Sequence, residues 1–91
     1  MSPLYSAVLN QHVQMVDLLI QNGAKLNTQN DRGQTPVMLA STEPSIEIVR
    51  LLLAAGADTK LQNYGGRTAL DLARIHGCTE AIVLLEAAMQ G

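Results

Sequence analysis

Apolar residues recur at helical spacing in three stretches of this 91-residue chain, separated by short polar segments that contain glycine. The middle stretch shows the pattern most fully, with apolar residues at positions 46, 48, 49 and 51 to 53. Ser45 can cap a helix over this stretch, and Gly56 can end it in a left-handed conformation. The pattern therefore predicts an amphipathic helix between Ser45 and Gly56.

A second, shorter helix precedes this one. The segment from Asn30 to Gly33 is typical of a turn, because Asn tolerates turn geometry and Gly supplies a positive φ without steric cost. Thr35 then offers a capping hydroxyl, and Pro36 suits the first helical position. The helix should be short because Pro44 disfavours helical geometry at the residue before it. Helices below roughly 12 to 15 residues are marginal alone in water, so the two must pack together.

The same pattern repeats with a period of 33 residues. One shift carries Pro3, Ala7, Leu18, Leu19 and Gly23 onto Pro36, Ala40, Leu51, Leu52 and Gly56. A second shift carries Thr35, Leu39, Ala40, Leu51 and Leu52 onto Thr68, Leu72, Ala73, Leu84 and Leu85. The period predicts one domain of three stacked units: residues 2–29 with a partial first turn, residues 30–62, and residues 63–91 as a candidate C-terminal cap.

Two kinds of repeated residue suggest how the units pack. The alanine at one position of each first helix allows a neighbouring helix to approach closely. The leucine pairs of the second helices should bridge successive units, so that shortening any of them to Ala costs roughly 2 to 5 kcal/mol. These pairs are Leu18 and Leu19, Leu51 and Leu52, and Leu84 and Leu85.

The unit resembles the ankyrin repeat, a 33-residue pattern of a β-turn and two antiparallel helices with a T-P-L-H-x-A opening. The middle copy opens Thr35-Pro36-Val37-Met38-Leu39-Ala40, and the resemblance covers essentially the whole chain. It implies an all-α ankyrin-repeat solenoid of helix-turn-helix units joined by β-turn or hairpin loops. It also implies a non-catalytic module that binds another protein.

The chain departs from the ankyrin pattern at a few positions. Tyr5, Met38 and Asp71 replace the histidine of the opening motif, so we expect the hydrogen bond that this histidine makes within the turn to be lost. Met89 stands where the pattern has a terminating glycine. The glycine between the two helices of a unit survives as Gly77 and is replaced in the first two units by Gln11 and Pro44.

Composition and charge narrow the classes of partner. The net charge is −2 with acids and bases scattered singly, so no basic stripe for nucleic acid is present. The chain has no apolar run of 18 residues, and we expect no membrane partner. The single cysteine fits a reducing compartment, cytoplasmic or nuclear, although a signal peptide removed by processing would leave no trace.

Catalytic or metal chemistry is poorly supported by the residues. His76 and Cys78 lie two positions apart, but a structural zinc site needs four ligands and a nucleophile pair needs an orienting third group. An ordinary turn between helices explains the pair more simply, and His12 fits a structural role at the start of a helix. We therefore expect no enzyme activity, no metal and no cofactor.

A protein-binding surface remains. The resemblance implies that partners contact the turn tips and the ends of the first helices, which line a concave face. Tyr64 and Arg67 are residue types enriched at interface hot spots, although each could also be a solvated loop residue. Leu9 and Asn10 lie on the same expected face. Leu9 and Ile75 are more ambiguous, because apolar residues at helix ends are often partly buried by the adjacent loop. The predicted contacts are Asp31, Arg32, Gln34, Thr42, Glu43, Tyr64, Arg67, Ile75 and His76.

Two alternatives stay open on sequence grounds. The chain could be a regulatory or targeting segment of a larger enzyme, channel or transcription regulator. It could instead be a structural protein that associates weakly with itself through its end faces, where Val83 and Met89 are apolar. Val83 occupies the position of polar Asp17 and Arg50, which argues against a well-made terminal cap unless it is one tolerated surface valine.

Overall fold

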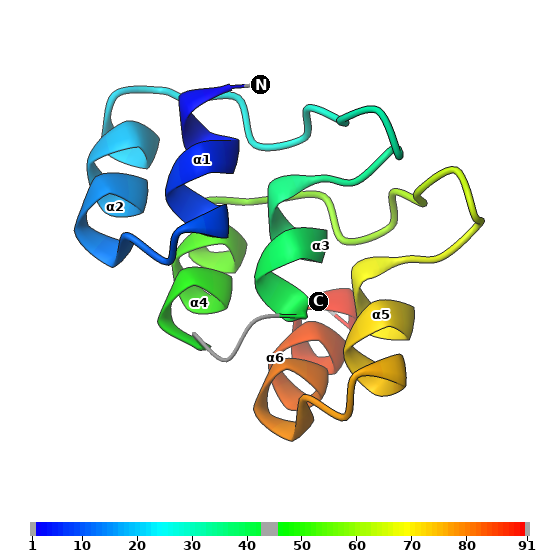
Figure 1. The fold of residues 1–91 in the computed structure, drawn as a ribbon. Helices are drawn as coiled ribbons and strands as arrows, with labels where there is room; N and C mark the ends of the chain where they lie inside the picture. Colours follow the sequence, from blue (N-terminus) through cyan, green and yellow to red (C-terminus); the bar gives the residue numbers. More distant parts are fainter. Residues whose placement is uncertain (1, 43–45, 91) are drawn as a thin grey trace.

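The computed structural model describes residues 2–42 and 46–90, which form six α-helices and no strand (Figure 1). The all-α prediction is confirmed. The helices are α1 (Pro3–Leu9), α2 (Val13–Gln21), α3 (Pro36–Ser41), α4 (Ile46–Ala54), α5 (Ala69–Ile75) and α6 (Thr79–Gln90).

The helices form two layers. In the first layer α1 packs on α3 and α3 on α5, and in the second α2 packs on α4 and α4 on α6. The loops that join one helix pair to the next project together to one side of the first layer (Figure 1). Helices α1, α3 and α5 and these loops therefore share one side of the molecule, and α2, α4 and α6 form the opposite side.

A hydroxyl caps the first helix of each unit. The side chains of Ser2, Thr35 and Thr68 each accept a hydrogen bond from the backbone amide three residues later, at 3.3, 3.4 and 3.2 Å. Proline occupies the first position of both α1 and α3, as expected where a missing N–H is harmless. The predicted helix start at Thr35 is confirmed.

Left-handed residues end the helices and close the turns. Gly33 and Gly56 have φ of 78° and 92°, as predicted. Gln11 adopts φ 57° between α1 and α2, close to the 67° of Gly77 between α5 and α6. The first unit therefore keeps this loop conformation without a glycine. The predictions for Pro44 and for capping by Ser45 lie outside the described residues.

The core follows the repeat, with one correction. Ala7, Ala40 and Ala73 are buried where neighbouring first helices meet. Leu52 is fully buried, but Leu18 is 52% exposed, so the prediction of a buried bridging leucine is wrong there. The reason is position in the stack: α4 and α6 each pack on a preceding second-layer helix and their equivalent residues Leu51 and Leu84 are half-buried, whereas no preceding helix packs on α2 within the described residues.

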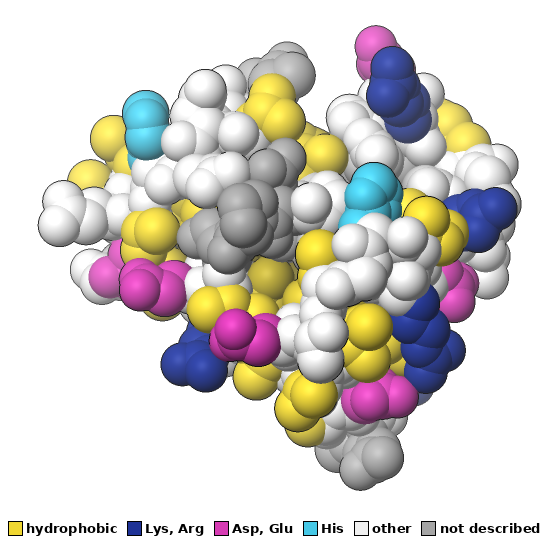
Figure 2. All heavy atoms as spheres, turned by 60° about the horizontal axis from the view of Figure 1, so that its bottom comes forward, with side chains coloured by type: hydrophobic (Ala, Val, Ile, Leu, Met, Phe, Trp, Pro, Cys, Tyr) yellow, Lys and Arg dark blue, Asp and Glu magenta, His cyan; other side chains and the backbone are white. Residues whose placement is uncertain are grey.

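The exterior mixes apolar and charged side chains. On the face shown in Figure 2, apolar side chains are scattered between acidic and basic ones, and neither charge dominates. Helix α6 continues past Met89, consistent with the missing glycine at that position. The large apolar residues that remain exposed are Leu9, Met15, Leu18, Tyr64, Ile75, Val83 and Met89.

Candidate protein-binding surface

Two hairpin turns with the same internal bonding form the edge of this surface. In the first, the side-chain Oδ1 of Asn30 accepts hydrogen bonds from the amides of Arg32 and Gln34, both at 2.9 Å. In the second, Asn63 accepts from Gly65 and Arg67 at 2.9 and 3.0 Å. The backbone amide of each asparagine also donates to the carbonyl four residues on. These local bonds hold both tips in one conformation without a partner.

The two hairpins are also bonded to each other. The amide of Tyr64 donates to the carbonyl of Arg32 at 3.0 Å. The side-chain amide of Gln29 donates both to the carbonyl of Gly33, at 2.9 Å, and to that of Gln62 in the next unit, at 3.0 Å. The turns therefore form one connected edge and not two independent loops.

Tyr64 lies across this edge with most of its side chain in solvent. The residue is 74% exposed, yet its ring lies so close to Gly33 that a Cβ there would come within 2.6 Å of Cδ1. One side of the ring is thus held by the preceding turn, while the rest is open. An aromatic side chain held in this way loses little conformational entropy on binding.

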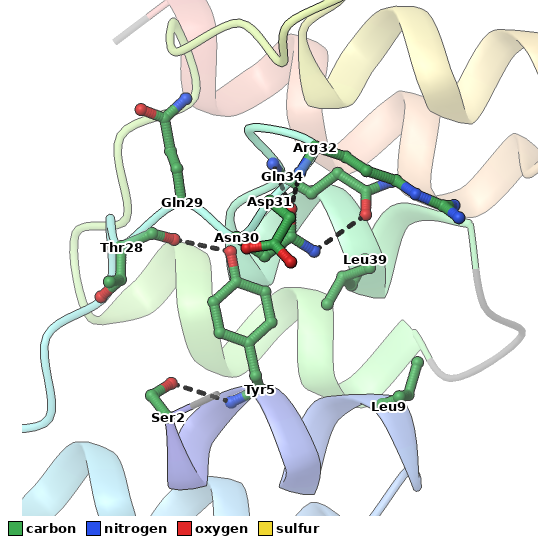
Figure 3. Close-up of a pocket in the computed structure, with 10 residues that line it drawn as sticks. All are labelled: Ser2, Tyr5, Leu9, Thr28, Gln29, Asn30, Asp31, Arg32, Gln34 and Leu39. Carbon is green, nitrogen blue, oxygen red and sulfur yellow. Dashed lines mark hydrogen bonds between the residues drawn. The ribbon is translucent and has the colours of Figure 1, made fainter.

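A groove of about 710 Å³ lies between the first hairpin and the first-layer helices (Figure 3). Leu9 of α1 and Leu39 of α3 form its apolar part, and the polar turn faces them. Its full lining is Ser2, Tyr5, Leu9, Thr28, Gln29, Asn30, Asp31, Arg32, Gln34 and Leu39.

Tyr5 lines the groove where helix α1 meets the loop that enters the first hairpin. Its hydroxyl donates a 2.7 Å hydrogen bond to the carbonyl of Thr28, and the residue is 2% exposed (Figure 3). Burial raises the pKa of this hydroxyl, because the charged phenolate would lose hydration. Tyr5 therefore stays a neutral donor that ties α1 to the loop entering the first hairpin.

The residues that replace the motif histidine make polar contacts of their own. Tyr5 makes the bond just described, and the Asp71 carboxylate accepts a 3.0 Å hydrogen bond from the Thr68 amide. In the middle unit the amide of Thr35 donates to the Met38 sulfur, a weak acceptor, at 3.5 Å. Each replacement thus offers a polar contact that the motif alone does not predict.

The structure brings only part of the predicted contact set together. Asp31, Arg32 and Gln34 line the groove, and Leu9 lies opposite them. Thr42 instead donates its hydroxyl to the carbonyl of Leu39 in its own helix, at 2.9 Å. Glu43 lies outside the described residues.

The other predicted contacts lie one unit further along. Tyr64 and Arg67 are exposed on the second hairpin, and Ile75 and His76 are exposed at the end of α5. Tyr5 and Leu39 also line the groove, although the sequence pattern did not predict them there. The sequence did contain one signal for Tyr5: it lies four residues before Leu9, on the same face of the helix.

Other kinds of site find little support in residues 2–42 and 46–90. This part of the chain holds no group of three or more His, Cys, Asp or Glu side chains that could bind a metal ion. The Cys78 thiol donates to the carbonyl of His76 at 3.9 Å, a contact within the loop between α5 and α6. None of the described helices is both long enough and apolar enough to cross a membrane.

Stacked helix pairs joined by projecting hairpins, with a preformed groove beside the hairpins, define a repeat-protein scaffold. A family model described as ankyrin repeats, in three copies, matches residues 4–90, and the chain belongs to this family. A comparison with curated proteins gave no match. Ankyrin repeats are generally protein–protein interaction modules and are typically not catalytic.

Proposed function

We propose that this chain is a non-catalytic protein-binding module whose turn tips and first helices together hold a protein partner. The observation that supports this most is the preformed groove beside the first hairpin, which is hydrogen-bonded to the second, because a rigid surface avoids the entropy cost of ordering on binding. Exposed apolar residues also occur on this side in the first and third units, at Leu9 and Ile75.

Tyr64 and Arg67 are the proposed anchors. Both are exposed on the second hairpin, and Arg67 has no ion-pair partner within the described ranges. A partner could therefore stack on the open part of the Tyr64 ring and pair with the guanidinium. The partner would also contact the groove at Asp31, Arg32 and Gln34. The far end of the contact would be formed by Ile75 and His76.

The surface chemistry favours a protein over other partners. A net charge of −2 with mixed signs gives no electrostatic footprint for nucleic acid or for an anionic membrane. The groove combines apolar residues with backbone-bonded polar ones, as is typical of protein-binding clefts. We propose a cytoplasmic or nuclear location, because a single free thiol suits a reducing compartment.

Affinity capture from the native organism followed by titration of the captured protein tests this function. Replacing both Tyr64 and Arg67 by Ala should weaken binding on the order of 100-fold or more, because hot-spot residues carry about 2 kcal/mol each. The control is Val83→Ala, which shortens another exposed apolar side chain, on α6 in the other layer. Unchanged affinity of the double variant, with an unchanged melting temperature, would reject the site.

A further inference from the structure

The charged residues of this chain are divided unequally between its two sides. Helices α2, α4 and α6 of the second layer carry four acidic residues and one basic residue, namely Asp17, Glu47, Glu80, Glu86 and Arg50. The first-layer helices and the two hairpins, residues 30–34 and 63–67, carry three arginines and two aspartates, namely Arg32, Arg67, Arg74, Asp31 and Asp71. The proposed binding side is therefore the more positive one, although the chain as a whole has a net charge of −2.

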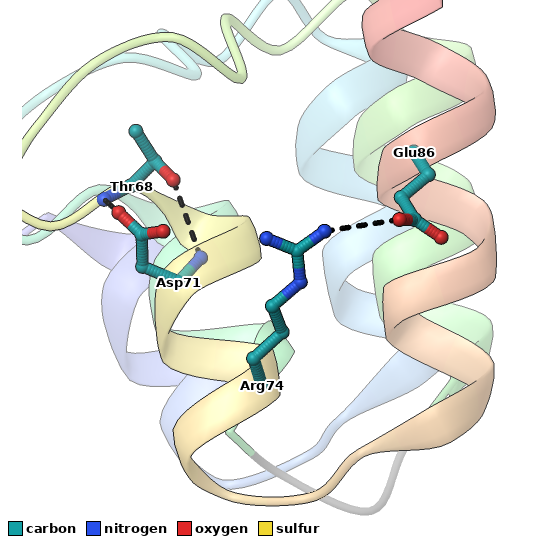
Figure 4. Close-up of polar contacts among 4 residues, drawn as sticks. All are labelled: Thr68, Asp71, Arg74 and Glu86. Atoms are coloured by element: carbon teal, nitrogen blue, oxygen red, sulfur yellow. Dashed lines mark hydrogen bonds and ion pairs between the residues drawn. The ribbon is translucent and has the colours of Figure 1, made fainter.

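The two charged residues of α5 already have partners within the protein. The Arg74 guanidinium forms a 3.0 Å ion pair with the Glu86 carboxylate (Figure 4). The Asp71 carboxylate accepts the hydrogen bond of the Thr68 amide at the start of its helix (Figure 4). The charges that remain for a partner on this side are therefore those of the hairpins.

The hairpins carry two arginines without an internal counter-charge. Arg32 and Arg67 are exposed, and neither side chain forms an ion pair within residues 2–42 and 46–90. Asp31 is the single acidic residue of the two hairpins, and its carboxylate and the Arg32 side chain extend in different directions (Figure 3). Both guanidinium groups are thus solvated cations on the preformed edge.

Tyr64 is connected to both arginines through the hydrogen bonds of the hairpins. Its backbone amide donates to the carbonyl of Arg32 at 3.0 Å. The residue before it, Asn63, donates its amide to the carbonyl of Arg67 at 2.9 Å and accepts from the Arg67 amide through its side chain at 3.0 Å. The side chains of Arg32, Tyr64 and Arg67, here called the tip cluster, therefore start from neighbouring points of one held edge.

We propose that the partner binds the tip cluster with an acidic segment of its chain. Its carboxylates pair with Arg32 and Arg67, and an adjacent apolar or aromatic side chain packs on the open part of the Tyr64 ring. Arginine suits carboxylates because its planar group donates two parallel hydrogen bonds. Two arginines neutralise too few phosphates to hold a nucleic acid. This partner chemistry rests on the proposed function, since both use the same edge.

Selection from a displayed library of random peptides, with the folded chain as bait, tests this partner chemistry. The enriched peptides should carry Asp or Glu next to an aromatic or aliphatic residue. A synthetic copy of an enriched peptide should bind about tenfold more tightly, or better, than the same peptide with its acids changed to amides. Its affinity should fall as salt rises from about 0.05 to 0.5 M, because the ion pairs lie at an exposed edge.

The variant Arg32→Gln/Arg67→Gln should lose the preference for the acidic peptide over its amide form. The matched control is Arg50→Gln/Lys60→Gln, which also removes two exposed positive charges but leaves the hairpins unchanged. It should keep the preference. Circular dichroism should show both variants folded, because backbone groups and asparagine side chains hold the hairpins.

Three outcomes would overturn the acidic-segment proposal. Enrichment of neutral or basic peptides that Tyr64→Ala no longer binds would overturn the acidic chemistry and keep the proposed site. An equal loss in the two double variants would show an effect of net charge alone and not of the tip cluster. Enrichment of no peptide would also overturn it, while titration of the captured protein decides the proposed function separately.

Discussion

Gly33 lies directly beneath Tyr64 of the next unit: a Cβ on this glycine would be 2.6 Å from the ring atom Cδ1 and 2.7 Å from the backbone nitrogen of Tyr64. Gly33 also has φ 78°, where side chains are disfavoured. Gly66, its equivalent in the following turn, has the same φ of 78°, but a Cβ on it would meet no atom within 4 Å. A comparison of the two glycines therefore separates the effect of backbone conformation on stability from the effect of close packing.

We predict that Gly33→Ala destabilises the fold more than Gly66→Ala. Gly66→Ala should cost about 1 to 2 kcal/mol, the strain of an alanine in the left-handed conformation. Gly33→Ala adds the clash with Tyr64 and should cost about 1 to 3 kcal/mol more. Urea unfolding measures both. The double variant Gly33→Ala/Tyr64→Ala should recover only part of the stability lost in Gly33→Ala, since the backbone nitrogen of residue 64 remains in place. Equal losses in Gly33→Ala and Gly66→Ala would contradict the role given to packing against Tyr64.

Tyr5 should make the stability fall at alkaline pH. Burial raises the pKa of its hydroxyl above the ordinary 10.0, so the folded state retains a proton that the unfolded state releases. The stabilisation is fully present below pH 10 and is lost as the pH rises through the folded-state pKa. Tyr5→Phe should remove this contribution and cost about 0.5 to 1.5 kcal/mol at neutral pH, through the lost bond to Thr28.

Urea unfolding of the wild type and of Tyr5→Phe, at a series of pH values from neutral to alkaline, measures how the contribution of the Tyr5 hydroxyl to stability changes with pH. The gap in unfolding free energy between wild type and Tyr5→Phe should narrow as the phenol ionises. A gap that widens with pH would show that the hydroxyl is stabilised in its charged form, contrary to the buried geometry.

Leucines with the same place in the repeat should differ in their effect on stability. Leu52→Ala should cost roughly 2 to 5 kcal/mol because the side chain is fully buried. Leu19→Ala, at the equivalent position of α2, should cost less because that residue is only half-buried. Leu18→Ala, at an exposed site, should change stability by about 0.5 kcal/mol or less. Thermal and urea unfolding give the order, and a large loss for Leu18→Ala would contradict the exposed position of this side chain.

The Arg74–Glu86 pair should contribute little to stability. Both side chains are about half exposed, so a double-mutant cycle with Ala should give a coupling of roughly 0.2 to 1 kcal/mol that declines with added salt. A coupling of several kcal/mol, insensitive to salt, would instead indicate a desolvated pair. The weak coupling expected follows from the exposure of both side chains to water.

The features that the sequence determined by itself are local ones. The turn from Asn30 to Gly33, the cap at Thr35 and the left-handed Gly56 depend on residues a few positions apart, so residue type and spacing suffice to predict them. The 33-residue period likewise predicted the stack of units, because each unit repeats the same local pattern of turn and helices. Asp31, Arg32 and Gln34 could be proposed as contact residues because the resemblance to the ankyrin repeat implies that partners contact the turn tips.

Only the tertiary structure decided which repeated residues are covered and which are brought together. Leu18 and Leu51 are the same residue at the same place of the repeat, yet their exposure differs because α4 packs on a preceding second-layer helix and α2 has none within the described residues. Tyr5 meets Thr28, and Gly33 meets Tyr64, across 23 and 31 residues of chain. The first contact depends on how the loop folds back on its own unit and the second on how units stack, and neither follows from residue type and local spacing.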